Sequence, residues 1–202
     1  MKLYYLTGAC SLASYISLLE AGQKFEAYAV ERGTKKTADG KDYNSINPKG
    51  YVPALVLDDG TTLTENVAVL TYISTLDASG KLGPKLGSME CFRILEWLAF
   101  INSEIHKTVG VIFRPTTPEE TKKQARETAL MRYGYIEKQL GDKPFLTGGN
   151  FTVADAYLYV VLSWRERLGI DISSLPKLTA FYERCRARPS VQQARKEEGL
   201  PP

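Results

Sequence analysis

A short stretch in the first third of the chain decides the fold, and it reads Asn47-Pro48-Lys49-Gly50-Tyr51-Val52-Pro53-Ala54-Leu55-Val56-Leu57. Proline cannot donate a backbone hydrogen bond, so Val52-Pro53 is tolerated only at the first residue of a strand or on a sheet edge. We therefore expect a strand that opens here on a sheet edge, where an extended ligand can hydrogen-bond. Asp58-Asp59-Gly60 then returns the chain as a hairpin.

Glu65-Asn66 follows the hairpin at the start of an amphipathic run. Free backbone amides and the macrodipole at a helix N-terminus favour a carboxylate, and a glutamate beside them can hold an ammonium group. The sheet edge and this helix start together predict a site for a ligand with an extended backbone and a free amino acid end. A strand-opening proline and ordinary helix capping explain the same residues equally well, so other parts of the chain must decide.

Composition and charge exclude several classes of protein. The 202 residues suit one large or two small domains, and the formal charge of +3 is too small and too dispersed for a nucleic-acid partner. The start of the chain breaks at Gly8 before a signal peptide forms, and no stretch approaches the roughly 18 apolar residues of a membrane span. We expect a cytoplasmic protein with no membrane partner.

Three widely separated cysteines argue against cysteine-based frameworks. Cys10, Cys91 and Cys185 form no Cys-x-x-Cys pair and no zinc-ligand cluster. We expect no disulfide, no metal and no cofactor.

Periodicity predicts a small α/β domain followed by helices. The first segments are a strand at 2–6, a helix at 10–21, a strand at 25–30, a helical turn near 43–46, hairpin strands at 54–57 and 61–63, and a helix with Val67, Leu70, Ile73 and Leu76 on its buried face. This is a βαβ unit followed by a ββα unit. Gly, Ser, Lys and Pro then dominate from Asp77 to Gly87, which predicts a first domain at 1–78, a linker at 79–87 and a second domain at 88–202.

The second domain is predicted to be all α. Its helices are expected at 88–113, 118–140, 153–168 and 175–187, with a short helical tail. Thr152 and Asp155 form a capping-box pattern, which we interpret as a folding signal. Tyr157, Leu158, Val161 and Trp164 form an apolar stripe that is expected to be core.

This organisation resembles a known family. A βαβ-ββα domain with a proline opening its third strand resembles thioredoxin-like folds, and the attached all-α domain is similar to the glutathione transferase architecture. Five motifs resemble the bacterial beta class, and together they span essentially the whole chain. They are Thr7-Gly8-Ala9-Cys10-Ser11-Leu12-Ala13-Ser14, Asn47 to Leu55, Leu63-Thr64-Glu65-Asn66, Glu104-Ile105-His106-Lys107 and Phe151-Thr152-Val153-Ala154-Asp155-Ala156-Tyr157.

The resemblance implies a glutathione site in the first domain. It implies a cis Pro53, a Val52 backbone that pairs with the cysteinyl part of glutathione, and γ-glutamyl anchors at Glu65 and Asn66. Asn66 departs from the usual serine, although its amide can still donate to a carboxylate. Tyr51 and Tyr15 replace a commoner Gln and His. Tyr51 is also one of the residues expected to bind glutathione.

Cys10 is the first candidate for catalysis. It follows a strand and a Gly-containing loop at the first turn of a helix, where the dipole and free amides are expected to lower the pKa of its thiol. Two roles are open: it donates a hydrogen bond to the glutathione thiolate, or it forms a mixed disulfide with glutathione. Ser11 and Tyr5 are further candidate donors through their hydroxyls.

His106 is the only histidine in the chain, and Lys107 follows it. A lone helical histidine is commonly structural, but the Glu-x-His-Lys match implies that both residues approach the glutathione sulfur from the α domain. Lys107 would act there as a cation and His106 as a tunable donor. The resemblance also assigns Ser103 and Glu104 to glutathione contacts across a dimer interface. Lys35, on a loop with no predicted anchor, is expected to reach the glycine carboxylate.

We therefore predict a cytosolic, homodimeric glutathione transferase of detoxifying type, with glutathione as co-substrate. It would add the glutathione thiol to a small hydrophobic electrophile held between the domains near Phe113 and Trp164, and no pattern identifies that electrophile. Thiol-disulfide exchange or peroxide reduction by Cys10 is a second enzymatic possibility. The alternative from another class is a non-catalytic ligand carrier or protein-interaction module, because a fold alone never decides function.

Overall fold

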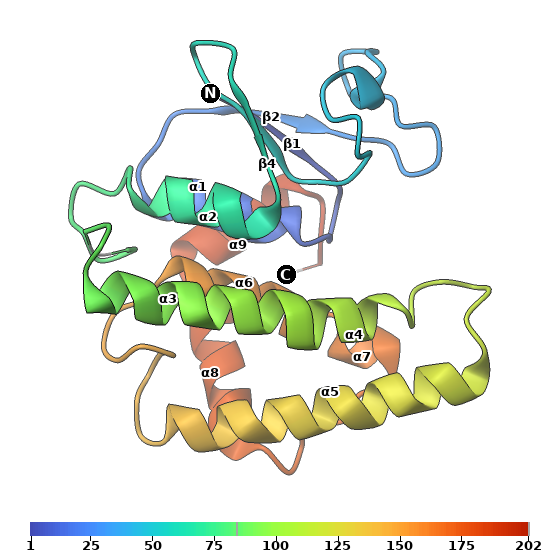
Figure 1. The fold of residues 1–202 in the computed structure, drawn as a ribbon, viewed down its shortest axis with the longest axis vertical. Coiled ribbons are helices and arrows are strands. Elements are labelled where there is room, and N and C mark those ends of the chain that lie inside the picture. The colour runs from blue at the N-terminus through green and yellow to red at the C-terminus, as the bar shows by residue number, and fades with distance from the viewer. Residues whose placement is uncertain (84, 202) are drawn as a thin grey trace.

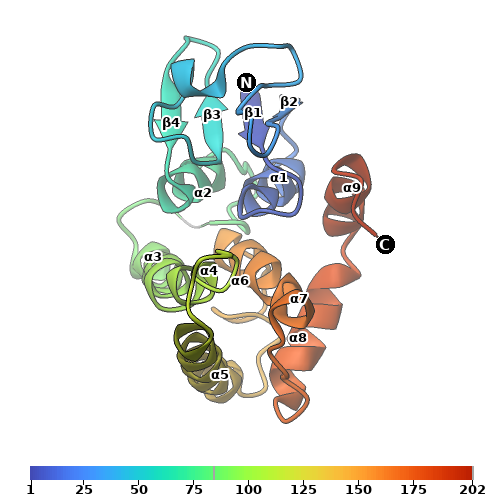
Figure 2. The ribbon, with the colours of Figure 1, turned by 90° about the vertical axis from the view of Figure 1, so that its right-hand side faces the viewer.

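The structure is a computed structural model that describes residues 1–83 and 85–201. Its N-terminal part holds a four-stranded sheet in the order β2-β1-β3-β4, in which β1 and β2 are parallel and the other neighbours are antiparallel. The strands are β1 (Lys2–Tyr5), β2 (Glu26–Ala29), β3 (Ala54–Val56) and β4 (Thr62–Thr64). Helices α1 (Ser11–Glu20) and α2 (Asn66–Ser74) cover one face of the sheet (Figures 1 and 2). The predicted βαβ-ββα order is confirmed.

The predicted sheet edge at Val52-Pro53 is wrong. β3 lies inside the sheet, between β1 and β4. The first paired residue of β3 is Ala54, which is opposite Tyr4 on one side and Thr64 on the other. Pro53 therefore stands just before the ladder, where its missing amide interrupts no pairing. Of the two placements that proline allows, the structure uses the strand start. A ligand would therefore meet the segment just before β3 and not a free edge of the sheet.

The rest of the described chain is helical. It contains α3 (Met89–Phe100), a π-helical segment (Ile101–His106), α4 (Lys107–Gly110), α5 (Glu119–Leu140), α6 (Val153–Ser163), α7 (Arg165–Leu168), α8 (Pro176–Arg186) and α9 (Pro189–Glu197). A 3₁₀ turn at Tyr43–Ser45 is the predicted turn in the first part. The predicted fold class, a thioredoxin-like part with an all-α part, is confirmed.

Two predicted helices differ from the structure. The helix predicted at 88–113 ends at Gly110 and changes to π geometry in its middle, where the Lys107 amide donates to the Asn102 carbonyl five residues before it. The helix predicted at 153–168 breaks at Trp164, which separates α6 from α7. Hydrophobic spacing cannot reveal either change, because both keep the apolar residues on nearly the same face.

Helix α6 is the centre of the core. All residues from Val153 to Leu162 are buried, and α6 packs on α1 from the N-terminal part. The predicted capping box is confirmed, since the Asp155 carboxylate accepts the backbone amides of Thr152 and Leu146, each at 2.8 Å. The burial predicted for α6 is thus confirmed and extends beyond one stripe.

The buried face of α2 is partly as predicted. Leu70 and Ile73 are fully buried, whereas Val67 is only partly buried and Val69 takes its place in the core. Leu76 lies beyond the end of the helix and is also only partly buried. A helix packed between a sheet and other helices buries more than one row of side chains, so a single stripe misses part of its contacts.

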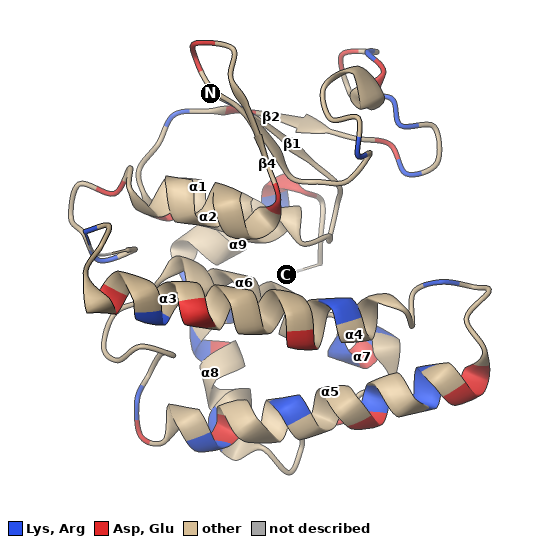
Figure 3. Ribbon diagram, viewed as in Figure 1, with Lys and Arg blue, Asp and Glu red and all other residues tan. Residues whose placement is uncertain are grey.

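Helix α9 returns to the N-terminal part and lies beside α1 (Figure 2). Arg188, just before α9, forms a two-pronged ion pair with Glu20 at the end of α1, with N–O distances of 2.7 and 2.8 Å. Charged residues gather along α5 and on the loops (Figure 3). Among the helices of the described ranges, none combines the length and the apolar character needed to cross a membrane.

Candidate functional site

Cys10 lies at the N-terminal end of α1, where it is the capping residue. Its Sγ is 3.3 Å from the Val52 carbonyl oxygen, so the thiol reaches across to the segment that leads into β3. The preceding turn is held through Gly8, which has a φ of 67°. The Gly8 amide donates to Glu198 at 2.8 Å, and its carbonyl accepts the Trp164 indole N–H at 2.9 Å.

The low thiol pKa predicted for Cys10 is wrong. Burial raises its pKa to about 12, and the backbone amides of Cys10 and Ser11 lower the pKa by less than burial raises it. The helix start therefore acts in the expected direction, but desolvation of the thiolate is the larger effect. Cys10 is a protonated thiol at neutral pH in this state, and it is able to donate its hydrogen.

The Val52-Pro53 peptide bond is cis, as the resemblance implied. The segment before it is held from inside, because the Tyr51 carbonyl accepts the Tyr43 hydroxyl at 2.7 Å and the Asn47 side-chain amide at 2.6 Å. The Tyr51 side chain itself is 74% exposed. The structure thus presents the backbone of this segment to the site while the predicted Tyr51 side chain points to solvent.

Glu65 and Asn66 stand at the start of α2, as predicted. Glu65 has a φ of 69°, and its carboxylate is paired with the Lys49 ammonium at 2.6 Å. Asn66 is 7% exposed, and its Oδ1 accepts the Ser14 hydroxyl at 3.1 Å. Its Nδ2 has no hydrogen-bond partner among the described residues. A buried donor left unpaired is costly, so a ligand acceptor at this helix start would recover that cost.

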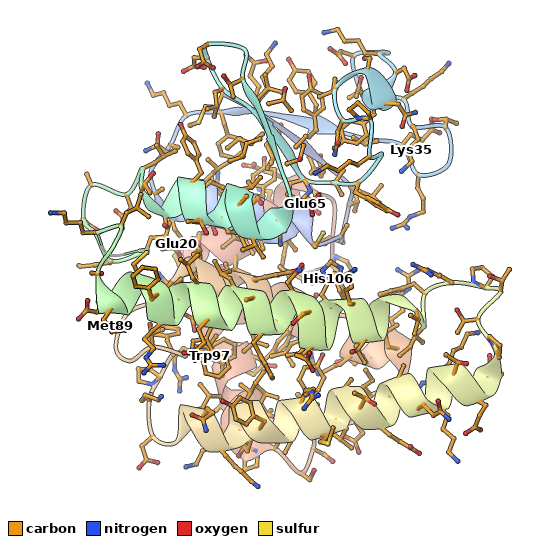
Figure 4. The ribbon with its side chains drawn as sticks, in the orientation of Figure 1. Glu20, Lys35, Glu65, Met89, Trp97 and His106 are labelled. Carbon is orange, nitrogen blue, oxygen red and sulfur yellow. The ribbon has the colours of Figure 1, made fainter. Side chains whose placement is uncertain are left out.

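His106 projects from the rod formed by α3, the π-helical segment and α4 toward the N-terminal part, on the side where Glu65 begins α2 (Figure 4). Its Nδ1 is 2.6 Å from the Tyr157 hydroxyl, and its ring lies 5.1 Å from the Trp164 ring, centroid to centroid. Burial lowers the pKa of His106 to about 4. His106 is therefore neutral at physiological pH, which limits the donor role predicted for it. Lys107, next to it, is exposed.

Several other predicted residues are engaged elsewhere. Ser11 is fully buried, and its hydroxyl donates to the Leu6 carbonyl at 3.4 Å while accepting the Leu6 amide at 3.1 Å, so its hydrogen is already engaged and the donor role predicted for it disagrees with the structure. Tyr5 is half-buried and packs edge-on against Tyr15, with 5.8 Å between ring centroids. Burial raises the pKa of the Tyr5 phenol, so its hydroxyl stays protonated, and the donor role expected for Tyr5 stays a prediction.

Ser103, Glu104 and Lys35 also have protein partners. The exposed Ser103 hydroxyl donates to the Ala99 carbonyl at 3.0 Å, and Glu104 pairs with Arg132 at 2.7 Å. The Lys35 ammonium donates to the Gly50 carbonyl at 2.7 Å, so its loop is anchored beside the cis-proline segment, contrary to expectation. Figure 4 places Lys35 on this loop, above His106 in that view and on the same side as Glu65.

Sequence reasoning gave no site role to four residues that the structure brings to this region. They are Ser14, Lys49, Tyr157 and Asn102. Lys49 lies in the motif from Asn47 to Leu55. Its positive charge is the one sequence signal that could link it to the Glu65 anchor. Tyr157 was interpreted as core, and no local pattern distinguishes its hydroxyl from any other buried phenol.

The described residues include no group of three or more His, Cys, Asp or Glu side chains placed to hold a metal ion. All three cysteines are free in this structure, with Cys91 and Cys185 buried.

Two domain families match this chain. The family described as glutathione S-transferase, N-terminal domain, matches residues 9–76, and the corresponding C-terminal domain family matches residues 97–189. Glutathione S-transferase GstA of Escherichia coli O157:H7 is 42% identical over 200 residues, which cover 99% of this chain and 100% of that protein.

Solved structures are similar over the same length. BphK, a bacterial GST solved as a ternary complex, is 46% identical with a TM-score of 0.97, covering 99% of this chain and 100% of its own. A sphingomonad glutathione S-transferase complexed with glutathione is 43% identical with a TM-score of 0.95, covering all of both chains. The matches extend through both the sheet part and the helical part that flank Cys10. The chain therefore belongs to the glutathione S-transferase family.

Proposed function

We propose that this chain is a glutathione transferase that binds reduced glutathione beside Cys10 and adds its thiol to a small electrophile. The observation that carries the proposal is the 3.3 Å contact between Cys10 Sγ and the Val52 carbonyl. This contact joins the thiol at the start of α1 to the backbone at Val52. The resemblance implies that this backbone pairs with the cysteinyl part of glutathione. In this proposal residues 1–78 form the glutathione-binding domain, 79–87 the linker and 88–202 the domain that lines the electrophile site.

The γ-glutamyl end of glutathione would bind at the start of α2. Its carboxylate suits the unpaired Asn66 Nδ2 and the free amides of the first turn. Its ammonium group suits Glu65, which the Lys49 ammonium now holds at 2.6 Å. Lys49 and Glu65 are both more than half exposed, and such surface pairs contribute little, so an incoming ammonium can displace Lys49 at small cost.

The opposite end of glutathione would lie toward the cis-proline segment. Lys35 is anchored there through Gly50, and a modest rotation of its flexible stem would let it meet the glycine carboxylate. Val52 would pair its backbone with the cysteinyl group, next to Pro53. These contacts use groups that the fold already holds in place, so binding requires little ordering of the chain.

Cys10 would act by turning its S–H hydrogen from the Val52 carbonyl, 3.3 Å away, to the glutathione sulfur. Its raised pKa keeps it protonated at neutral pH, which suits a donor and works against attack by a Cys10 thiolate. Direct thiol-disulfide exchange or peroxide reduction by Cys10 would first need its pKa lowered, for example by a cation brought closer on binding. Lys107 would supply such a positive charge near the glutathione sulfur, where it would stabilise the thiolate.

The electrophile would lie against aromatic rings of the helical part. Phe113 and Trp164 meet edge to face with ring centroids 5.5 Å apart, and the Arg167 guanidinium lies 5.2 Å from the centre of the Phe113 ring. A flat aryl group with a leaving group fits such a wall, because aromatic faces gain from stacking and from a nearby cation. We propose small aryl electrophiles as the substrate class, consistent with a detoxifying role in the cytoplasm.

The chain would act as a homodimer. An exposed apolar face runs along α3 and α5, where the rings of Trp97 and Phe100 contact Tyr135. Its large exposed side chains are Met89, Phe92, Leu130, Met131 and Tyr135. Ser103 and Glu104 sit on the same rod, which would bring them near the partner. Phe92→Glu should convert a dimer to a monomer in analytical ultracentrifugation, and a native chain that sediments as a monomer would end this proposal.

One experiment tests the transferase activity. Glutathione affinity and conjugation of a generic aryl chloride are measured for the native chain, for Cys10→Ala and for Cys10→Ser. A donor role predicts that Cys10→Ser keeps most of the activity while Cys10→Ala loses about tenfold in kcat. If Cys10→Ala conjugates normally but forms no mixed disulfide with glutathione, Cys10 is a redox residue. A native chain that binds no glutathione at millimolar concentration would refute the function.

A further inference from the structure

The buried phenol of Tyr157 belongs to α6, the helix that packs against α1 and α2 of the N-terminal part and against the π-helical segment. Its side chain projects from α6 and is fully buried, and its hydroxyl lies 2.6 Å from His106 Nδ1 and 3.1 Å from Asn102 Oδ1. Both partners belong to the π-helical segment Ile101–His106. A phenol oxygen carries one proton and accepts two hydrogen bonds, so its neighbours decide where that proton points.

The neighbours of Tyr157 leave one consistent arrangement of protons. Asn102 presents its carbonyl oxygen, which only accepts, so the phenol must donate its single hydrogen to Asn102. The phenol oxygen can then only accept at the 2.6 Å contact, which requires the hydrogen to be on His106 Nδ1. The opposite assignment would leave the oxygens of Tyr157 and Asn102 facing each other without a hydrogen, and a buried pair of that kind is unfavourable.

The other groups around the phenol agree with this assignment. Burial raises the pKa of Tyr157 far above its ordinary value. Tyr157 is therefore never a phenolate under physiological conditions, and its hydroxyl remains available to donate. Trp164 links this cluster to the turn that carries Cys10: its ring lies 5.1 Å from the His106 ring, centroid to centroid, and its indole N–H donates to the Gly8 carbonyl at 2.9 Å.

We propose that Tyr157 is a positioning residue that holds neutral His106 in the Nδ1-protonated form, so that its Nε2 carries a free lone pair for the glutathione thiol. This inference rests on the proposed glutathione transferase function and assigns a direction to proton transfer within it. His106 would accept a proton, whereas Cys10 and Lys107 would stabilise the charge that develops on sulfur. The Trp164 ring packs against the imidazole and limits its rotation.

The proposed step balances in atoms and charge. The S–H bond of glutathione breaks and an Nε2–H bond forms, which gives a thiolate paired with an imidazolium. The adjacent negative charge offsets the burial that holds the His106 pKa at about 4 before glutathione binds. The sulfur electron pair then forms the C–S bond of the conjugate as the aryl carbon loses its halide with the bonding pair. The imidazolium releases its proton to water and returns to the neutral form, so the net products are the thioether, a halide ion and a proton.

The chain offers an unusually direct test, because His106 is its only histidine. In protein labelled with ¹⁵N, two-bond correlations between ring nitrogens and carbon-bound protons distinguish a protonated nitrogen from a bare one. We expect a single imidazole with a protonated Nδ1 and a bare Nε2 between neutral and mildly acidic pH. A native protein in which Nε2 carries the hydrogen would overturn the proposal without any variant.

Substitution separates positioning from packing. Tyr157→Phe keeps the ring and removes the hydroxyl, and we expect mixed tautomers and a kcat about tenfold lower, with the KM for glutathione changed by less than about threefold. Asn102→Ala, at a half-exposed position, removes the acceptor of the Tyr157 hydroxyl. It should also give a mixture of the two neutral His106 tautomers. Unchanged tautomer and kcat in Tyr157→Phe would refute the positioning role.

Tyr133→Phe is the matched control. Tyr133 is a fully buried phenol of α5 whose hydroxyl has no hydrogen-bond partner among the described residues. Its removal should leave both the tautomer and kcat unchanged. If kcat and the His106 tautomer change as much in Tyr133→Phe as in Tyr157→Phe, the effect comes from the loss of any buried hydroxyl and not from the positioning of His106.

The two proposals fail in different ways. Absence of glutathione binding to the native chain, measured by calorimetry, would refute the function whatever the tautomer of His106. Normal binding and conjugation together with a hydrogen on Nε2 would refute the role of Tyr157 and leave the transferase function intact.

Discussion

The cis-proline segment and the helical side of the proposed site are built over very different sequence distances. On the N-terminal side, the Tyr51 carbonyl is held by Asn47 and Tyr43, four and eight residues away. On the helical side, His106 is held by Tyr157, 51 residues away. Local motifs therefore describe the cis-proline segment well, whereas the helical side depends on how separate helices pack, as does the contact of Cys10 with Val52, 42 residues away.

The two sides also differ in which atoms they offer. The N-terminal side presents backbone groups at Val52 and at the start of α2, and these take their place once the strand and helix form. The helical side presents an imidazole whose orientation and hydrogen placement depend on buried side-chain bonds. Substitution of one side chain should consequently disturb the helical side more than the N-terminal side.

The largest expected effect is on the scaffold of the helical side. Asp155→Ala removes the acceptor for the Leu146 and Thr152 amides in a fully buried position. We expect the free energy of unfolding to fall by about 3 kcal/mol, measured by urea denaturation, because two buried amides lose their partner. Asp142→Ala, at an exposed residue, should be almost neutral. Equal losses in both variants would contradict this account of α6.

His106 should make stability depend on pH. Its folded pKa of about 4 lies below the ordinary value of 6.5, so its neutral form contributes stability above pH 6.5 that is lost as the pH falls toward 4. Relative to His106→Gln, we expect the native chain to lose about 2 kcal/mol between about pH 8 and about pH 5. Urea denaturation of both proteins at the two pH values measures this difference. Parallel pH profiles would show that the imidazole is not desolvated.

Asn66 tests the N-terminal side. Asn66→Ala removes the buried Nδ2 donor, and we expect glutathione affinity to fall about tenfold in calorimetry because a charge-bearing ligand group loses its hydrogen bond. Asn66→Ser should lose less, since a hydroxyl can also donate. Asn150→Ala, at an exposed residue that is not part of the proposed glutathione site, is the control. Unchanged affinity in Asn66→Ala would mean that the backbone alone binds the carboxylate.

The smallest effect is expected at Lys49. Lys49→Met removes the cation that occupies Glu65, so the KM for glutathione should decrease by less than about threefold, measured in initial-rate assays. Lys41→Met, which removes an exposed lysine paired with Asp39 instead, should not change it. An increased KM in Lys49→Met would indicate that Lys49 contacts glutathione directly.

Much of the architecture was predictable because its signals are local. The strand-opening Val52-Pro53, the helix start at Glu65 and the capping box at Thr152 and Asp155 each depend on residues close in sequence. Turn and capping chemistry is the same in any fold, so these elements formed as predicted. The position of β3 inside the sheet was not predictable in this way, since sheet order depends on the pairing of distant strands.

Predictions about the chemical state of side chains were less successful. The helix start at Cys10 was identified, but the direction of its thiol pKa was wrong because burial outweighed the helix amides. Ser11 was adjacent in sequence, yet its hydroxyl faces the Leu6 backbone. Spacing along a chain locates a residue on an element, whereas solvation and hydrogen-bond partners come from everything that packs around it.

The amino-acid sequence by itself determined the order of elements, the glutathione transferase resemblance and the approximate positions of Cys10, Glu65, Asn66 and His106, because periodicity, capping and turn preferences act over a few residues. Only the tertiary structure decided that Cys10 meets Val52, that Lys49 occupies Glu65 and that Tyr157 and Asn102 orient His106. Those contacts join segments far apart in the chain, and desolvation on packing, which no local pattern encodes, decides their protonation states.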